Sequence, residues 1–390
     1  MQNAAQRPSD AARERNAVEQ KSFGGRYGSS QRAPRRSNIE LLRILSMLLI
    51  VLHHYACRGR TLYPGDVPSF ERFFQYALMQ VGALGDDLFV LISGYFLIER
   101  PFSLRRILRL WGEVFFYSVT VTLIGWAVSP PEGGVNLNAL VSMAAPCLTG
   151  KYWFVTAYIL LALLSPFLNR MLRALTRREF GWLLLLLFVS VSVLPTFMQG
   201  FMGWSQLATF ILLYCVAGYM RLYPDGVPLL KGCRRSFIAG LGLFGLLLLF
   251  VAGCMLLGVR FAPFRYYMMF FTAIHAVPQV VIAAVLFWAF LQWEMRPNRF
   301  VNAVASTALA VYLIHENKAL REWMWSDVVR VQACVFEAWM PLHAIFWALV
   351  IFAVCAAVDL LRQRFIDPLW LRLIDRIPPV RRELERAARR

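Results

Sequence analysis

The chain has 390 residues, of which 58% are hydrophobic and only 16% are charged. A soluble domain usually has about a quarter of its residues charged, so this composition excludes an ordinary water-soluble enzyme, a disordered protein and a coiled coil. The long apolar runs also exclude a transmembrane barrel, because barrel strands alternate apolar and polar residues. The composition therefore predicts an all-α fold and a polytopic membrane protein.

Ten apolar segments are predicted to cross the membrane, which takes about 20 apolar residues per helix. Most of them reach that length, and the ninth is short. In chain order the predicted spans are residues 39–57, 73–98, 110–129, 152–169, 180–198, 205–220, 237–258, 267–293, 302–315 and 339–361.

The net charge of +18 is distributed unevenly along the chain. With the N-terminus in the cytoplasm, 32 of the 41 Lys and Arg residues fall on the inner side of the predicted spans. Cytoplasmic loops of membrane proteins carry such an excess of basic residues. Both termini are therefore predicted to be cytoplasmic, in a multi-pass protein of the cell (cytoplasmic) membrane. No basic motif with interleaved aromatic residues is present, so nucleic-acid binding is not expected.

Three regions are predicted along the chain. Residues 1–38 are polar and basic and are expected to form a disordered cytoplasmic tail. Residues 39–361 form the transmembrane domain. Residues 362–390 are a basic cytoplasmic tail in which Leu369 and Trp370 begin an apolar pattern at helical spacing. This tail is either an amphipathic helix on the inner membrane surface or a solvated basic segment, and the sequence favours neither.

The first predicted span contains an arginine and a histidine on one helix face. Arg43 and His54 are eleven residues apart, which places them about 20° apart around the helix and about 16 Å apart along it. His53 points about 80° away from the Arg43 direction. Ionisable groups at membrane depth are costly, so Arg43 and His54 are candidate functional residues. A snorkelling arginine and a packing histidine are the structural alternatives.

The second span contains two adjacent carboxylates, Asp86 and Asp87, near its middle. Two charges at the bilayer midplane are not expected to face lipid, so at least one should pair with an arginine, a histidine or a backbone group. Because they cannot share a helix face, different partners are expected. A helix-packing contact without chemistry is the alternative.

The inner loop after this span predicts an anion site. Ser103 is a candidate helix N-cap, which puts Arg106 and Arg109 on one face in the first turns of the third helix. Two guanidinium groups so placed suit a phosphate or pyrophosphate. Ordinary positive-inside charge is the alternative. Glu113, one turn further, is expected to hold Arg109 in place.

Two later motifs are weaker signals. Residues 151–154 read Lys-Tyr-Trp-Phe and are typical of an interfacial aromatic belt. His315, followed by Glu316, ends the ninth span near the outer surface, where a packing role is favoured. No metal-ligand spacing is present, and no metal is expected.

Four stretches together resemble the acyltransferase 3 family of integral membrane acyltransferases. They are Arg43-x10-His54, Asp87-Leu88-Phe89-x-x-x-Ser93-Gly94, Arg106-x-x-Arg109 and Tyr312-Leu313-Ile314-His315. The resemblance covers roughly residues 36–361. The stretch after Trp153 lacks the W-S-L-x-x-E pattern of many members, and it is more similar to the stand-alone form without a fused SGNH domain.

The resemblance implies a membrane O-acyltransferase and, within that class, an O-acetyltransferase. Such enzymes move an acyl group from cytoplasmic acyl-CoA, here expected to be acetyl-CoA, to a hydroxyl of an envelope or exported polysaccharide or its lipid-linked precursor. It implies His54 and Asp87 as catalytic residues and Arg43, Arg106 and Arg109 as donor-binding residues. The expected partners are acyl-CoA, a glycan acceptor and membrane lipids.

The geometry of the first helix agrees with this expectation. An extended pantetheine arm could span the distance from Arg43 to His54, and a neutral His54 could act as a general base. A covalent acyl-histidine is equally compatible with the sequence. The rival interpretation is a transporter or flippase, which midplane carboxylates also fit. It is disfavoured because no repeat relates residues 39–198 to residues 205–361.

Overall fold

The computed structural model describes residues 36–61, 68–131, 133–198, 205–225 and 230–388. The chain divides into residues 1–36 and a compact unit formed by residues 37–390, and the description below concerns that unit. Its regular elements in the described ranges are all helical, which confirms the predicted all-α fold. Most of the predicted tail 1–38 lies outside the described residues.

Seven helices are long and apolar enough to cross a membrane. They are α2 (Ser37–Arg58), α3 (Phe70–Leu97), α4 (Leu104–Val128), α6 (Trp153–Ala174), α7 (Arg177–Phe188) with its continuation to Phe197, α10 (Cys233–Arg260) and α16 (Met340–Phe365). Shorter apolar helices are α9 (Gln206–Leu222), α12 (Val277–Gln292), and α13 (Arg299–Ala305) joined to α14 (Ala308–His315). The chain is therefore an all-α multi-pass membrane protein. The total of ten spans and the cytoplasmic termini stay predictions.

Two predicted spans do not form a continuous helix over their predicted length. The span predicted at 267–293 becomes regular helix only at Val277, where Pro278 occupies the first turn and needs no hydrogen-bond acceptor for its nitrogen. Between α13 and α14, the hydroxyls of Ser306 and Thr307 donate to carbonyls three residues earlier. The backbone nitrogens of the same two residues also donate three residues back, so the α-helical pattern is lost there and the ninth span is interrupted.

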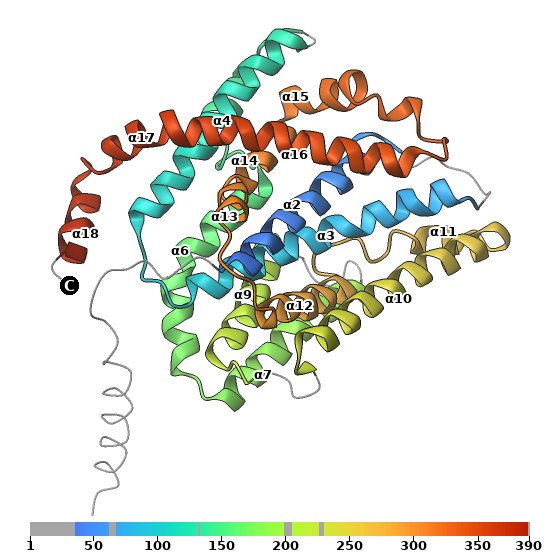
Figure 1. Ribbon diagram of the computed structural model, residues 1–390, viewed down its shortest axis with the longest axis horizontal. Helices are drawn as coiled ribbons and strands as arrows, with labels where there is room; N and C mark the ends of the chain where they lie inside the picture. Colours follow the sequence, from blue (N-terminus) through green and yellow to red (C-terminus); the bar gives the residue numbers. More distant parts are fainter. Residues whose placement is uncertain (1–35, 62–67, 132, 199–204, 226–229, 389–390) are drawn as a thin grey trace, which may run out of the picture. The chain divides into compact units, whose positions relative to one another are not determined.

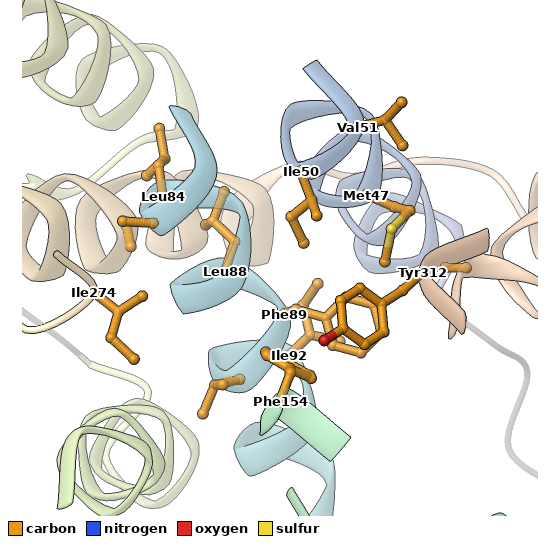
Figure 2. Close-up of a cluster of buried hydrophobic side chains, with 14 of the residues drawn as sticks. Met47, Ile50, Val51, Leu84, Leu88, Phe89, Ile92, Phe154, Ile274 and Tyr312 are labelled. Carbon is orange, nitrogen blue, oxygen red and sulfur yellow. The ribbon is translucent and has the colours of Figure 1, made fainter. Parts of the chain in front are cut away.

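Helices α2 and α3 pack along each other at the centre of the unit (Figure 1). Gly82 and Gly85 let the helices approach, since a Cβ on Gly85 would lie 2.7 Å from the Ser46 carbonyl oxygen. The opposite face of α3 packs on α9, where Gly94 meets Tyr214. Figure 2 shows the buried side chains gathered around α2 and α3. These two helices form the scaffold that positions the site.

Helix α14 carries the second part of the site. It packs against α2, α4 and α16, and the following α15 (Lys318–Trp323) packs on α4. A Cβ on Gly125 of α4 would lie 2.6 Å from backbone atoms of Ala319, so the two backbones are in close contact. This packing brings the carboxyl end of α14 to the carboxyl end of α2.

The C-terminal segment forms α17 (Asp367–Ile374) and α18 (Pro378–Ala388), which dock on α4. Trp370 packs on Gly112 and donates to the Leu108 carbonyl oxygen. Val380 is fully buried. The segment is thus helical but is not simply a solvated tail. The exposed apolar residues Leu369 and Leu373 remain compatible with a membrane surface.

Replacing Gly85 by alanine should destabilise the protein by about 1–3 kcal/mol, because the added methyl overpacks the contact between α2 and α3. The measurement is thermal unfolding of the purified protein in detergent. Gly242→Ala in α10 is the matched control, since its Cβ would meet nothing within 4 Å. The control should be neutral or slightly stabilising. Equal effects of both variants would contradict the proposed close packing.

Candidate functional site

His54 and His315 form the centre of the candidate site. His54 lies near the carboxyl end of α2, and His315 is the last residue of α14. Both rings are buried, and His54 Nδ1 lies 2.8 Å from His315 Nε2. Because 261 positions separate them in the chain, only the packing of α14 on α2 brings them together.

The second ring nitrogen of His315 determines the direction of this hydrogen bond. His315 Nδ1 lies 2.5 Å from the carbonyl oxygen of Val311, one turn earlier in α14. A carbonyl oxygen only accepts hydrogen bonds, so Nδ1 must carry a proton. When both rings are neutral, His315 Nε2 is therefore the acceptor and His54 Nδ1 is the donor. This assignment leaves His54 Nε2 unprotonated, with a lone pair that can accept a proton.

A carboxylate and two arginines lie beside His54 Nε2. Glu316 Oε2 is 3.7 Å from this nitrogen. Arg58 donates to both carboxylate oxygens of Glu316, with Nε 3.2 Å from Oε2, and Arg321 Nη1 lies 2.6 Å from Oε1. The two guanidinium groups hold the carboxylate in position. A protonated His54 would therefore find a counter-charge next to Nε2.

Tyr312 and Asp86 border the histidine pair. The Tyr312 ring lies among Phe89 and Phe154 (Figure 2), and its centroid is 6.3 Å from that of His315. The Tyr312 hydroxyl is buried, and no described residue forms a hydrogen bond with it. Asp86 is half-buried and close enough to Tyr312 and Glu316 to interact electrostatically.

Asp87 lies on another face of α3. It precedes Gly94 by seven residues, about 20° short of two turns, so it faces α9 rather than α2. Its carboxylate is buried, and neither oxygen has a hydrogen-bond partner in the described ranges. The expected pairing of Asp86 or Asp87 with an arginine, a histidine or a backbone group is therefore wrong for the described part of the chain. The catalytic role of Asp87 stays a prediction, which no contact with His54 supports.

Arg43 lies on the same uninterrupted helix as His54. It forms an ion pair with Glu40 at 3.4 Å, and its guanidinium lies 5.8 Å from the centroid of the Phe89 ring. On the face between Arg43 and His54, Met47 and Ile50 are buried (Figure 2). An extended ligand running from Arg43 to His54 would therefore pass over apolar side chains.

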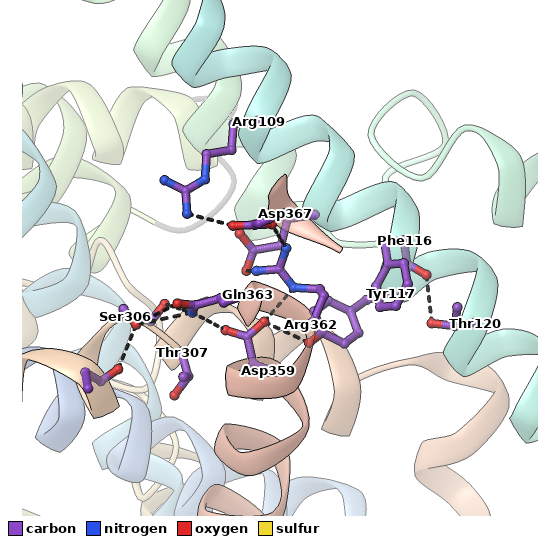
Figure 3. A network of polar contacts seen from close by, with 12 residues as sticks. Arg109, Phe116, Tyr117, Thr120, Ser306, Thr307, Asp359, Arg362, Gln363 and Asp367 are labelled. Carbon is purple, nitrogen blue, oxygen red and sulfur yellow. Dashed lines mark hydrogen bonds and ion pairs between the residues drawn. The ribbon is translucent and has the colours of Figure 1, made fainter. Parts of the chain in front are cut away.

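The expected anion site begins as predicted and then differs. Ser103 caps α4, with its hydroxyl oxygen 3.4 Å from the Arg106 backbone nitrogen. The Arg106 guanidinium donates to the Pro101 carbonyl oxygen. Arg109 Nη2 instead lies 2.8 Å from Asp367 Oδ2 of α17 (Figure 3). Arg106 thus forms no ion pair with a described carboxylate, whereas Arg109 does.

Acidic residues of the C-terminal segment account for two further contacts at this end of α4. Asp375 accepts from Arg105 at 2.6 and 3.0 Å, and Glu383 accepts from the backbone nitrogen of Leu104 at 2.9 Å. These contacts hold α17 and α18 at the start of α4, the side predicted to be cytoplasmic. The positive end of the helix is thereby neutralised by the chain itself.

Glu113 does not hold Arg109, contrary to the sequence-based expectation. Its nearest charged partner is Arg362 of α16, at 3.5 Å. Arg362 also binds Asp359 at 2.7 Å and contacts Asp367, and Figure 3 shows this network. Asp367 pairs with Arg109 because α17 docks directly against α4. The sequence of residues 103–113 alone does not indicate this packing.

The sequence favours a packing role for His315 and assigns no role to Arg58, Glu316 or Arg321. The signal was present in the stretch His315-Glu316 at the end of an apolar helix, because two adjacent titratable residues there require partners. No local pattern in the sequence marks Arg58 or Arg321. The pairing of Arg58 with Glu316 depends on the packing of distant helices, whereas Arg321 lies only five residues from Glu316.

Replacing Glu316 by glutamine should destabilise the protein by about 2 kcal/mol, because it leaves two partly buried guanidinium groups without a counter-charge. Thermal unfolding in detergent measures the effect. Glu322→Gln is the control, since Glu322 is exposed on α15. An unfolding temperature of Glu316→Gln equal to that of the control would contradict the ion-pair assignment.

Comparison with known proteins identifies the chain at the level of its family. A family model described as an acyltransferase domain, acyltransferase 3, matches residues 36–362. No curated protein and no solved structure matches the chain. The matched range contains the Arg43-to-His54 helix, the α4 arginines and the histidine pair. The chain therefore belongs to the acyltransferase 3 family and is a membrane acyltransferase.

Proposed function

We propose that this protein is an acyl-CoA-dependent O-acyltransferase that uses His54 as its general base. One observation carries the proposal: the hydrogen bonds from His54 to His315 and from His315 to Val311 leave His54 Nε2 as the proton acceptor. Glu316, next to this nitrogen, would stabilise the imidazolium that forms. General-base catalysis by such a histidine contributes about 10²–10⁴-fold to a rate.

The reaction balances as follows. His54 Nε2 takes the proton of an acceptor hydroxyl while the hydroxyl oxygen forms a bond to the thioester carbonyl carbon. The carbon–sulfur bond then breaks, and the CoA thiolate leaves and receives the proton from His54. The products are the acyl ester of the acceptor and free CoA. We infer acetyl as the acyl group and a polysaccharide of the cell envelope as the acceptor from the family resemblance.

The donor is proposed to bind with its nucleotide at the inner end of the helix unit. Arg106, at the start of α4, is available there. Arg43, in the first turns of α2, and Arg109 can contribute if they exchange their contacts with Glu40 and Asp367 for phosphate. Met47, on the face leading to His54, is unbranched and can change rotamer to admit a pantetheine arm.

His54→Ala should reduce acetyl-CoA turnover at least about 100-fold, because the proton acceptor is lost. The assay follows free thiol released by purified protein in liposomes. His315→Ala should lower the rate by a smaller factor. His54 then keeps a basic lone pair, but no hydrogen bond to His315 fixes which ring nitrogen carries it. His53→Phe is the matched control: the His53 ring packs on Gly82, its centroid lies 5.6 Å from that of His54, and it forms no hydrogen bond with either histidine of the pair, so activity should stay within a few-fold of wild type. Normal turnover by His54→Ala would refute the proposed base. A burst of CoA equal to the enzyme concentration without acceptor would favour an acyl-histidine instead.

Arg106→Ala should raise the Michaelis constant for acetyl-CoA by about tenfold with little change in kcat, because a charge-assisted phosphate contact is lost. Arg109→Ala should have a smaller effect, since Arg109 already has a carboxylate partner. Arg178→Ala, an exposed arginine on α7, serves as the control. If Arg106→Ala and Arg178→Ala give the same constant, the donor does not bind at the start of α4.

A further inference from the structure

Lys151 is a buried lysine in the polypeptide that leads into α6. Its ammonium donates to three oxygens of α4: the Ser118 carbonyl at 3.4 Å, the Ser118 hydroxyl at 3.1 Å and the Thr122 hydroxyl at 2.6 Å. No described carboxylate forms an ion pair with it. A buried charge without a counter-ion is costly, so a role in packing alone does not account for a lysine at this position.

The Thr122 hydroxyl also contacts Asn317, the residue that follows Glu316. Asn317 Nδ2 donates to the Thr122 hydroxyl at 3.2 Å and to the Tyr152 hydroxyl at 2.9 Å. Tyr152 in turn donates to the Leu313 carbonyl oxygen at 3.1 Å. Asn317 also caps α15 through the Ala319 backbone nitrogen. Asn317 and Tyr152 are completely buried.

This chain of hydrogen bonds encloses the two site residues of α14. Leu313 precedes His315 by two residues, and Asn317 follows Glu316 directly. The turn between α14 and α15 is therefore held at Leu313 by Tyr152 and at Asn317 by Thr122, and the same Thr122 hydroxyl binds the Lys151 ammonium. A displacement of about 1 Å at such a site can reduce a rate about 100-fold.

We propose that Lys151 is a positioning residue: through Thr122 and Asn317, its ammonium fixes the turn that presents His315 and Glu316 to His54. The inference rests on the proposed function, in which His54 is the base. Lys151 does not itself reach the histidine pair. It acts only through the turn between α14 and α15.

The protonation of Lys151 provides a readout that simple packing does not. Burial, with a smaller contribution from the neighbouring Lys318 ammonium, lowers the pKa of Lys151 from 10.5 to about 8. The other titratable groups near this network are Tyr152, in direct contact with Asn317, and Glu316, which Arg58 and Arg321 neutralise. Above pH 8 the amine keeps two donors but loses its charge, so the bond to Thr122 weakens.

The test compares wild type with Lys151→Met, which has nearly the same shape, in full-length protein in liposomes. The variant should have a kcat about tenfold lower for acetyl-CoA turnover and an unchanged Michaelis constant. Wild-type kcat should fall as the pH rises through 8, whereas the variant should be independent of pH between 7.5 and 9.5, a range chosen around the lowered pKa. Lys318→Met, an exposed neighbour, should keep wild-type kcat at pH 7, with the decline moved to higher pH.

Stability should change in the opposite direction over the same range. The folded state binds fewer protons at Lys151 than the unfolded state between pH 8 and 10.5, so the wild type gains stability there relative to Lys151→Met. Activity that falls while stability rises cannot result from loss of packing. A decline in wild-type kcat that Lys151→Met retains would overturn the proposal.

Two further measurements test the inference, and the first does not depend on turnover. Amide hydrogen exchange of residues 313–320 should be faster in Lys151→Met and unchanged in Lys318→Met, and equal exchange in both would refute the positioning role. Thr122→Val should lower kcat as Lys151→Met does, and the double variant should be no slower than either one, because both act through one chain of bonds. If His54→Ala is inactive but Lys151→Met is normal, the positioning role fails and the proposed base stands.

Discussion

The hydrogen bond between His54 and His315 is the contact on which the interpretation of this structure depends. It joins two helices that come from opposite ends of the chain, and it exists only because α14 is packed between α2, α4 and α16. Its direction follows from one further atom, the Val311 carbonyl oxygen, which can only accept. A backbone group in α14 thereby determines which nitrogen of His54 can take up a proton.

The histidine pair is surrounded by charged groups that are costly to bury and that balance one another. Glu316 is buried, and its charge is balanced by Arg58 and Arg321 rather than by a single partner. Buried ionisable clusters in a membrane protein mark candidate functional sites. Lys151 and its neutral partners reach the same turn through Thr122 and Asn317, so the backbone between α14 and α15 meets both the Glu316 ion pairs and the hydrogen bonds of Lys151. The rest of the interior around α2 and α3 is largely apolar (Figure 2).

Local features of the structure could be predicted from the sequence. The single helix carrying Arg43 and His54, the Ser103 cap of α4 and the apolar helices follow from helical periodicity and capping preferences. The contacts that define the site could not, because they join residues far apart in the chain. Arg362 illustrates the difference: it was placed in the cytoplasmic tail, yet it is buried among Asp359, Asp367 and Glu113. The basic character of Arg362 is evident in the sequence, whereas its ion-pair partners depend on how α16, α17 and α4 pack.

Carboxylates of the C-terminal segment change how the start of α4 meets an anion. Asp375 and Glu383 already occupy the positions where an anion would meet Arg105 and the end of the helix. A phosphate group that displaces them exchanges one set of ion pairs for another, and only Arg106, which has no described carboxylate partner, offers it unbalanced charge. The free energy of that exchange is a difference between two screened interactions, and salt weakens both. The affinity of this helix end for an anion is therefore less sensitive to ionic strength than expected from the number of arginines there.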